Sequence, residues 1–120
     1  MTKTLDQSEL QRFTGSEYWY RHALNRQVLF TDGAKYVADQ ASAYWLLDEI
    51  ALAQRYEKAV AAEEFQCWTL TIHDNHTGTL ACDDGNGDIV YTKEINFTDF
   101  PRDGIVLWCT NNTILLPSEY

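Results

Sequence analysis

The stretch "FQCWTLTIH", residues 65–73, decides the fold, because its side chains alternate in character at every step. The large apolar residues of one phase are Trp68, Leu70 and Ile72, and the other phase is small or polar. A period of two is typical of a β-strand with one face in an apolar core. The stretch therefore predicts a half-buried strand that has Trp68 on its core side.

The segments that follow it read as an antiparallel meander. They are "GTLAC" (78–82), "DIVYTKEINF" (88–97), "IVLWCT" (105–110) and the short "ILL" (114–116). For Leu80 and Cys82 to share the core face with Trp68, the first loop must be odd, such as three residues near 75–77. Matching Leu80 to Tyr91 and Cys82 to Ile89 predicts the next register, with a two- or four-residue turn between them.

Before residue 65 the sequence predicts one hairpin and three helical segments. "VLFTDGAKYV" (28–37) has β-rich runs on both sides of Asp32-Gly33, the pair that a type I′ turn favours. Residues 41–55 carry apolar residues at helical spacing, with Ser42 as the N-cap. A short N-terminal helix is predicted over 5–13, ended by Gly15, and a further helical turn within 57–64.

These elements predict an α+β fold. The sheet should be a mostly antiparallel meander of five to seven strands, with one principal amphipathic helix packed on one face and a short helix at the N-terminus. The chain has 120 residues and 45% hydrophobic residues, and it contains no low-complexity linker. We therefore expect a single domain over residues 1–120.

Composition also bears on compartment and on the cysteines. The sequence contains no run of the roughly 20 apolar residues that a membrane span requires, and its first residues lack the apolar stretch of a secretory signal. We expect a cytoplasmic protein. Cys67, Cys82 and Cys109 are odd in number and show no CxxC spacing, so we expect reduced thiols. The predicted register places Cys82 on the core face and Cys67 on the other.

The net charge is −9, and it is concentrated in the second half of the chain. Residues 1–56 hold seven acidic and six basic residues, whereas residues 57–120 hold eleven acidic and three basic residues. Such a field repels nucleic acid and anionic membranes, and it attracts basic protein surfaces. Solubility alone is the simpler interpretation of the same charge.

The stretch "ACDDGNGDIVY" (81–91) resembles a calcium loop at first sight. Counted from Asp84, however, position 6 is Ile89 and position 12 is Ile95, where an EF-hand has glycine and glutamate. We therefore interpret it as a hairpin turn. Five aspartates lie at or near predicted turns that can share one end of the sheet, and they form a candidate acidic interaction surface: Asp83, Asp84, Asp88, Asp99 and Asp103.

Motifs for catalysis or for bound cofactors are weak. His73 and His76 have no third metal ligand at a recognisable spacing, no GxSxG elbow occurs, and the glycine-rich turn has no lysine to hold a phosphate. Asp48 and Glu49 are interpreted as solvated helix charges rather than an acid/base pair. The sequence assigns no catalytic, cofactor-binding or metal-binding residue, and no cofactor.

The first half of the chain is unusually aromatic. Large rings occur in "YWY" and "YW", and they form a candidate aromatic surface: Tyr18, Trp19, Tyr20, Tyr44 and Trp45. Tyrosine and tryptophan are enriched at interfaces, where the ring is desolvated and the polar tip still finds a partner. Core packing is the alternative interpretation.

Several phrases of this sequence resemble a known family. "TDGAKYVADQASAYWLLDEIA" (31–51), "AEEFQCWTL" (62–70), "NFTDFP" (96–101) and "TNNTILLPSEY" (110–120) are similar to small bacterial proteins grouped as a domain of unknown function, often encoded on plasmids and other mobile elements. The resemblance implies no catalytic or ligand-binding residue. It implies a context in which a small acidic protein can interfere with a host defence complex.

The leading hypothesis is thus a non-enzymatic, acidic protein-binding module, in its sharpest form an anti-defence protein that mimics nucleic acid. Its partner would be a protein with a basic surface, with no direct binding to nucleic acid or membrane, and a homodimer is compatible with the pattern. The second hypothesis is a ligand-binding or enzymatic domain with an aromatic pocket of Tyr18, Trp19, Tyr44 and Trp45. The third is a structural, self-associating domain.

Overall fold

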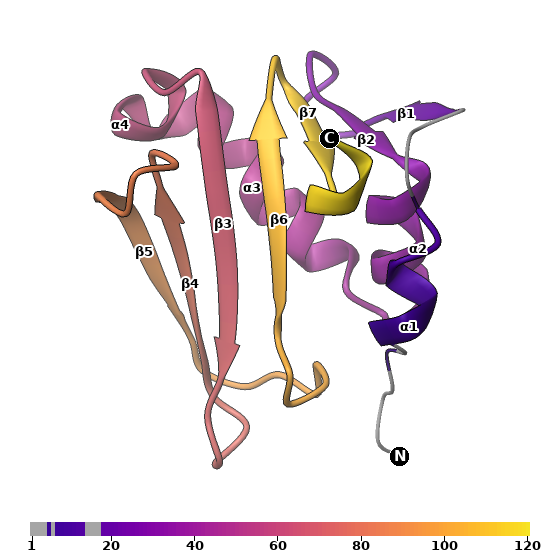
Figure 1. Cartoon of the computed structure of the whole chain (residues 1–120). Coiled ribbons are helices and arrows are strands. Elements are labelled where there is room, and N and C mark those ends of the chain that lie inside the picture. Colours follow the sequence, from indigo (N-terminus) through magenta and orange to yellow (C-terminus); the bar gives the residue numbers. More distant parts are fainter. Residues whose placement is uncertain (1–4, 6, 14–17) are drawn as a thin grey trace.

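A computed structural model of the chain describes residues 5, 7–13 and 18–120, and it shows an α+β fold around a seven-stranded sheet (Figure 1). The strand order across the sheet is β1-β2-β7-β6-β3-β4-β5. The strands are β1 (Trp19–Arg21), β2 (Leu29–Thr31), β3 (Phe65–Ile72), β4 (Gly78–Asp83), β5 (Ile89–Ile95), β6 (Ile105–Thr110) and β7 (Thr113–Leu115). The helices are α1 (Gln7–Leu10), α2 (Asp32–Gln40), α3 (Tyr44–Tyr56), α4 (Lys58–Ala61) and the 3₁₀ helix η1 (Pro117–Glu119).

The sheet is mixed. Strands β3, β4 and β5 form the antiparallel meander that the sequence predicts, but β2 and β7 run parallel. The direction of β7 is set by its hairpin with β6, whose turn residues Asn111 and Asn112 have positive φ angles of 51° and 57°. Two such residues make a tight hairpin turn, so β7 must run back along β6 and meets β2 in the same direction.

The core lies on one face of the sheet, and the alternation of β3 places it there. Trp68 is buried, and it pairs with Cys82 of β4 and with Leu107 of β6, which are also buried. Leu70 pairs with Leu80 on the same face. The first loop is odd, as predicted, because the backbone N–H of His73 donates to the carbonyl of Thr77 at 2.9 Å and leaves three residues between them.

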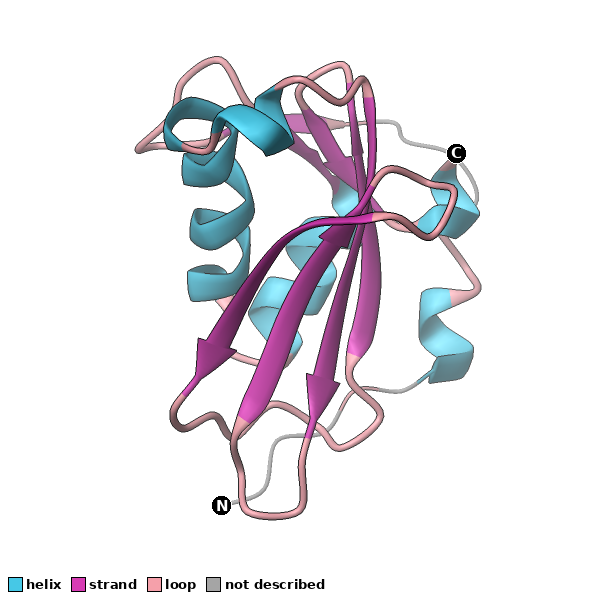
Figure 2. Ribbon diagram, turned by 90° about the vertical axis from the view of Figure 1, so that its left-hand side faces the viewer, coloured by secondary structure: helices cyan, strands magenta, loops and turns pink. Residues whose placement is uncertain are grey.

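Helices α3 and α4 cover this face, and α1 and η1 lie on the other side of the sheet (Figure 2). Helix α3 buries Leu46, Leu47 and Ile50, which confirms the predicted helical face. It begins two residues after Ser42, however, and its N-cap is Ala43, because Ser42 has a φ of 51°. The short helices α1 and α4 were predicted, whereas Gly15 lies outside the described residues.

The predicted hairpin at residues 28–37 is wrong. Only β2 is a strand there, and Thr31 is instead the N-cap of α2, with its hydroxyl accepting the N–H of Ala34 at 3.3 Å. The helix buries Ala34, Val37 and Ala38. The chain therefore has two comparable helices, α2 and α3, that pack on each other, in place of one principal helix.

A buried glutamate explains why Gly33 stands at the start of α2. The side chain of Glu119 accepts the hydroxyl of Thr31 at 2.6 Å and the N–H of Gly33 at 3.1 Å. A carboxylate here is favoured by the positive end of the helix dipole and satisfies backbone donors that the helix cannot. A Cβ on Gly33 would collide with this carboxylate, so glycine is required for close approach rather than for a turn.

The register between β4 and β5 also differs from the prediction. Leu80 pairs with Lys93, and Cys82 pairs with Tyr91, two residues beyond the predicted partners. A shift of two preserves which face each side chain takes, so Tyr91 still faces the helices. The cause is an irregularity between Cys82 and Asp83 together with a longer turn, which leaves Ile89 56% exposed. In the described part of the chain, no helix has the length and apolar character to cross a membrane.

Candidate functional site

The face of the sheet away from α3 carries side chains that no strand neighbour can bury. These are the second-phase residues of β3 and β6, among them Phe65, Cys67, Thr69, Val106 and Trp108. Helix η1 contacts β6, but no helix of the described residues lies over the β3–β4–β5 part of this face (Figure 2). We call this whole side of the sheet, β6 included, the open face.

Three rings gather on the open face. Phe65 lies 5.0 Å from Trp108 and 6.1 Å from Tyr120, and Trp108 lies 5.4 Å from Tyr120, as distances between ring centroids. All three pairs meet edge to face, an arrangement that aromatic rings favour. Tyr120 is 76% exposed, and Phe65 and Trp108 are half-buried. The open-face cluster (Phe65, Trp108 and Tyr120) is therefore an aromatic patch that remains accessible to solvent.

The turn between β4 and β5 borders this cluster. We call it the acidic loop (Asp83, Asp84 and Asp88). It is ordered by its own carboxylates: Asp83 accepts the N–H of Gly85 at 2.7 Å, and Asp84 accepts the N–H of Asn86 at 2.8 Å. Such bonds are typical of aspartate in turns. The position of a Cβ on Gly85 would lie 2.8 Å from the ring of Phe65, so the loop rests against the cluster.

The five predicted acidic residues do not form one surface. Asp99 and Asp103 lie on the connection between β5 and β6, at the opposite end of the sheet from the acidic loop (Figure 1). Successive turns of an antiparallel meander alternate between its two ends, so these two turns cannot meet. The expectation of a shared end is wrong for Asp99 and Asp103.

A groove of about 410 Å³ runs along β3 and β6 on the same side of the sheet. Its lining includes Thr69 and Val106 on the strands, Leu10 in α1 and Pro117 in η1. Arg102 and Asp103 line it as well, and the guanidinium of Arg102 is paired with the carboxylate of Asp74. The basic group of the groove is therefore already neutralised.

The five rings of the candidate aromatic surface differ in their exposure. Tyr18, Trp19 and Tyr44 are exposed, whereas Tyr20 and Trp45 are half-buried and pack against the core. Two of the five rings meet around Lys35, because its ammonium lies 5.6 Å above the ring of Tyr20 and the Asp39 that it binds also accepts the hydroxyl of Tyr44.

The carboxylate between these groups is held in its charged form. Lys35 donates to Asp39 at 2.8 Å, and Tyr44 donates to the other oxygen at 2.5 Å. The bond from Lys35, followed by that from Tyr44, lowers the pKa of Asp39. The same bond raises the pKa of Tyr44, so this hydroxyl stays protonated at neutral pH and is no general base.

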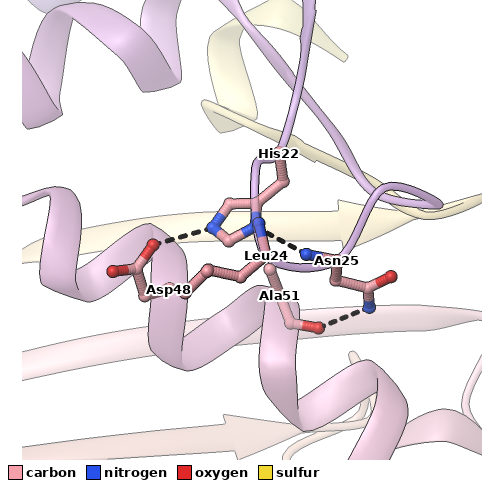
Figure 3. A network of polar contacts seen from close by, with 5 residues as sticks. All are labelled: His22, Leu24, Asn25, Asp48 and Ala51. Atoms are coloured by element: carbon pink, nitrogen blue, oxygen red, sulfur yellow. Dashed lines mark hydrogen bonds and ion pairs between the residues drawn. The ribbon is translucent and has the colours of Figure 1, made fainter.

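His22, which sequence reasoning left unassigned, is the centre of a buried network (Figure 3). Its Nδ1 lies 3.1 Å from the backbone nitrogens of both Leu24 and Asn25, which donate to it. The proton must then be on Nε2, which lies 2.8 Å from Asp48 and donates to it. Both ring nitrogens are occupied, so this histidine and carboxylate pair holds the loop and has no nitrogen left to accept a proton from a substrate.

The three cysteines are held in their protonated form, because the pKa of each thiol is raised. Burial raises the pKa of Cys82 and of Cys109 to about 12, and it also raises the pKa of Cys67. All three are free thiols. Within the described ranges, no group of three or more histidine, cysteine or acidic side chains can hold a metal ion.

Comparison with known proteins places the chain in a family without assigning it an activity. Neither the curated proteins nor the solved structures give a significant match. A family profile matches residues 4–120, nearly the full length. The chain therefore belongs to a family of unknown function (DUF6876).

Proposed function

We propose that this protein is a non-enzymatic binding module whose open face docks a positively charged segment of another protein. The observation that carries the proposal is the contact between the open-face cluster and the acidic loop. Tryptophan and tyrosine are enriched among the few residues that dominate the binding energy at interfaces, and charged groups at the rim guide the partner. Here the rim carboxylates of Asp84 and Asp88 have no basic residue paired with them in the described chain.

Local charge decides what kind of partner fits. Besides the acidic loop, Glu94 lies on the open face, where its carboxylate accepts the hydroxyl of Thr79 at 3.1 Å. Arg102 is the basic residue at the far end of the neighbouring groove, and Asp74 neutralises it. An approaching segment with lysine or arginine therefore gains attraction, whereas an acidic segment, DNA or RNA is repelled.

A role without catalysis agrees with the state of the reactive side chains. His22 uses both ring nitrogens within the protein, and the two buried cysteines remain protonated because their pKa is raised. Acid/base or nucleophilic catalysis needs a group poised to give up or accept a proton near neutral pH. Neither the His22 network nor the two buried thiols supply such a group.

An anti-defence role is one form of this proposal. The net charge of −9 and the resemblance to proteins of bacterial mobile elements both favour a target that normally holds DNA or RNA in a basic groove. Because Asp99 and Asp103 lie far from the acidic loop, we restrict the proposal to a short contact at that loop. Duplex DNA should then compete with this protein for the same partner.

A matched pair of charge reversals tests the proposal. Asp88→Lys changes the acidic loop, and Asp99→Lys makes the same change at the opposite end of the sheet; both side chains are exposed. A partner captured by the wild-type protein is purified, and its affinity is measured by calorimetry over a series of NaCl concentrations. We expect Asp88→Lys and Trp108→Ala to abolish or strongly weaken binding, Asp99→Lys to leave it nearly unchanged, and affinity to fall as salt rises.

Capture of a protein does not support the proposal by itself. Equal affinity of the Asp88→Lys and Asp99→Lys variants, or binding that does not respond to salt, would contradict it. A second copy of this chain is the competing occupant of the open face. Its net charge of −9 opposes self-association, so light scattering of the free protein should give a monomer mass at every concentration.

A further inference from the structure

A second candidate site lies on the helix side of the molecule, in the pocket between the loop that joins β1 to β2 and the C-terminal part of α3. The pocket has a volume of about 380 Å³, within the range of small-molecule sites. The lining residues that matter here are Asn25, Arg26, Gln27, Gln54, Arg55 and Asn112. The open face has no part in it.

The charge of this pocket is opposite to that of the chain. No acidic residue lines it, although the protein has 18 acidic residues and a net charge of −9. Arg26 and Arg55 belong to its lining, and the guanidinium group of neither forms an ion pair or hydrogen bond with the described residues. A third is close by, because Arg21 donates to the carbonyl of Arg26 at 2.5 Å.

Most of the other described basic side chains differ from these two. Four of the six are bound to carboxylates: Arg12, Lys35, Lys93 and Arg102. In a chain with twice as many acidic as basic residues, an intramolecular partner for an arginine is easily available. The pocket therefore concentrates positive charge that the fold itself does not neutralise.

The walls of the pocket are held in place before any ligand arrives. Asn25 is 5% exposed, and its amide donates to the carbonyl of Ala51 in α3 at 2.8 Å (Figure 3). Its side-chain oxygen accepts the N–H of Gln27 at 3.2 Å, and His22 ties the start of the loop to Asp48. A site that is already ordered loses less entropy on binding.

We propose that this pocket binds a small molecule through an oxyanion, a phosphate or a carboxylate, held by Arg26 and Arg55. The planar guanidinium presents paired N–H donors that match both groups, and it is more weakly hydrated than an ammonium. The side-chain amides of Gln27 and Asn112 supply neutral donors beside it.

The neighbouring surface limits where the rest of the ligand can carry charge. A groove of about 290 Å³ shares Gln54 and Asn112 with the pocket, and its lining includes Glu63 and Glu64. These carboxylates repel a second anionic group. The ligand should therefore carry its negative charge at one end and be neutral or cationic at the other.

Titration of the full-length, isotope-labelled protein by NMR tests the site, with inorganic phosphate and acetate, a monocarboxylate, as separate probes. We expect saturable shifts of the Arg26 and Arg55 side-chain N–H signals and of the Gln27 amide. Arg26→Gln or Arg55→Gln should weaken binding about tenfold, the usual effect of removing a charge-assisted hydrogen bond. Arg12→Gln, on α1's side of the molecule, is the matched control and should bind as the wild type does. The stronger of the two probes identifies the oxyanion.

Two outcomes would overturn the proposal. Shifts that stay linear in probe concentration, or that are as large at Arg12 and Lys58 as in the pocket, would indicate an adventitious ion only. Arg26→Lys keeps the charge but loses the planar fork, and we expect it to bind more weakly than the wild type; equal affinity would exclude recognition by the fork. All these side chains are exposed, so an unchanged amide spectrum of each free variant verifies that the fold is intact.

Discussion

The two faces of the sheet are built from the same strands and differ in what covers them. Behind the sheet, α3 seals Trp68, Leu70 and Leu80, and no buried side-chain nitrogen or oxygen among the described residues lacks a hydrogen bond. In front, the open-face cluster and the acidic loop meet solvent. The alternation along β3 and β6 therefore separates two kinds of residue. Those that stabilise the fold lie on the face beneath α3, which we call the covered face, and those available for contact with a partner lie on the open face.

The covered face also holds polar groups that a purely apolar core would not need. The side-chain amides of Gln66 and Gln54 donate a hydrogen bond to each other, each of 2.7 Å, and Trp68 donates its indole N–H to Gln66 at 3.0 Å. Gln66 further donates to the carbonyl of Val60 in α4. This network joins β3, α3 and α4 at fixed positions, because each amide has a single arrangement that satisfies it.

Truncating one tryptophan on each face should give the largest contrast. Trp68 is 1% exposed, so Trp68→Ala should lower the free energy of unfolding by about 3–5 kcal/mol, the usual cost of emptying a buried aromatic site. Trp108→Ala removes an equal side chain from the open face and should cost roughly 1 kcal/mol. Urea denaturation of both variants measures the difference. Equal destabilisation would show that the open face is part of the core.

We expect the next largest loss of stability when the side chain of Glu119, which anchors the start of α2, is removed. Glu119→Ala leaves the hydroxyl of Thr31 and the N–H of Gly33 without their acceptor, at a cost of about 2 kcal/mol. Glu119→Gln keeps one acceptor oxygen and should cost less. Denaturant midpoints of the two variants, compared with the wild type, test this order.

A double-mutant cycle separates the anchor from general packing. Gly33→Ala should be strongly destabilising, since its new Cβ meets the carboxylate of Glu119. Part of that cost should disappear in the Glu119→Ala background, because the carboxylate that the new Cβ meets is then absent. Strictly additive effects would mean that Gly33 and Glu119 do not interact.

His22 allows a finer test of what holds the loop on α3. Its Nδ1 serves two backbone donors, one of them buried, whereas the carboxylate of Asp48 is 43% exposed and can be hydrated. His22→Gln retains a donor towards Asp48 but loses the Nδ1 acceptor, so it should cost about 2 kcal/mol. His22→Asn places an acceptor near Nδ1 and should cost about half as much. The reverse order in thermal or urea melts would assign the main role to the contact with Asp48.

Sequence periodicity was sufficient for the parts of the fold that local pattern controls. The phases of β3 and β4 could be predicted because Trp68, Leu70, Leu80 and Cys82 repeat every two residues. It failed at Asp32-Gly33, since this pair suits both a tight turn and the first turn of a helix. What decides between them is Glu119, which is 86 residues away from Gly33 and gives no local signal.

The candidate site was less predictable than the fold. The open-face cluster combines rings at positions 65, 108 and 120, and only the pairing of β3 with β6 brings the first two together. A signal did exist, because Phe65 and Trp108 are large rings on the outward phase of their strands. The separation of Asp99 from the acidic loop could also have been predicted, since consecutive turns of a meander lie at opposite ends.

The reactivity of the three cysteine thiols compares the two faces with the smallest change to the protein. Cys67 lies on the open face, opposite Asp83 in the neighbouring strand, whereas Cys82 and Cys109 are buried on the covered face. Burial raises the pKa of all three thiols, to about 12 for the two buried ones. Only the thiolate attacks a disulfide reagent, so reaction should be slow at neutral pH and faster as pH rises.

In the native protein a chromogenic disulfide reagent should therefore modify Cys67 first. Cys82 and Cys109 should react only when the sheet opens, at a rate that follows the unfolding equilibrium and so increases in urea. Cys67→Ser should remove the fast phase and leave the stability nearly unchanged, because its side chain contributes little to the covered core. If two or three thiols instead react together in the native state, the covered face opens more readily than its packing indicates. The two faces would then not differ in their accessibility to the reagent.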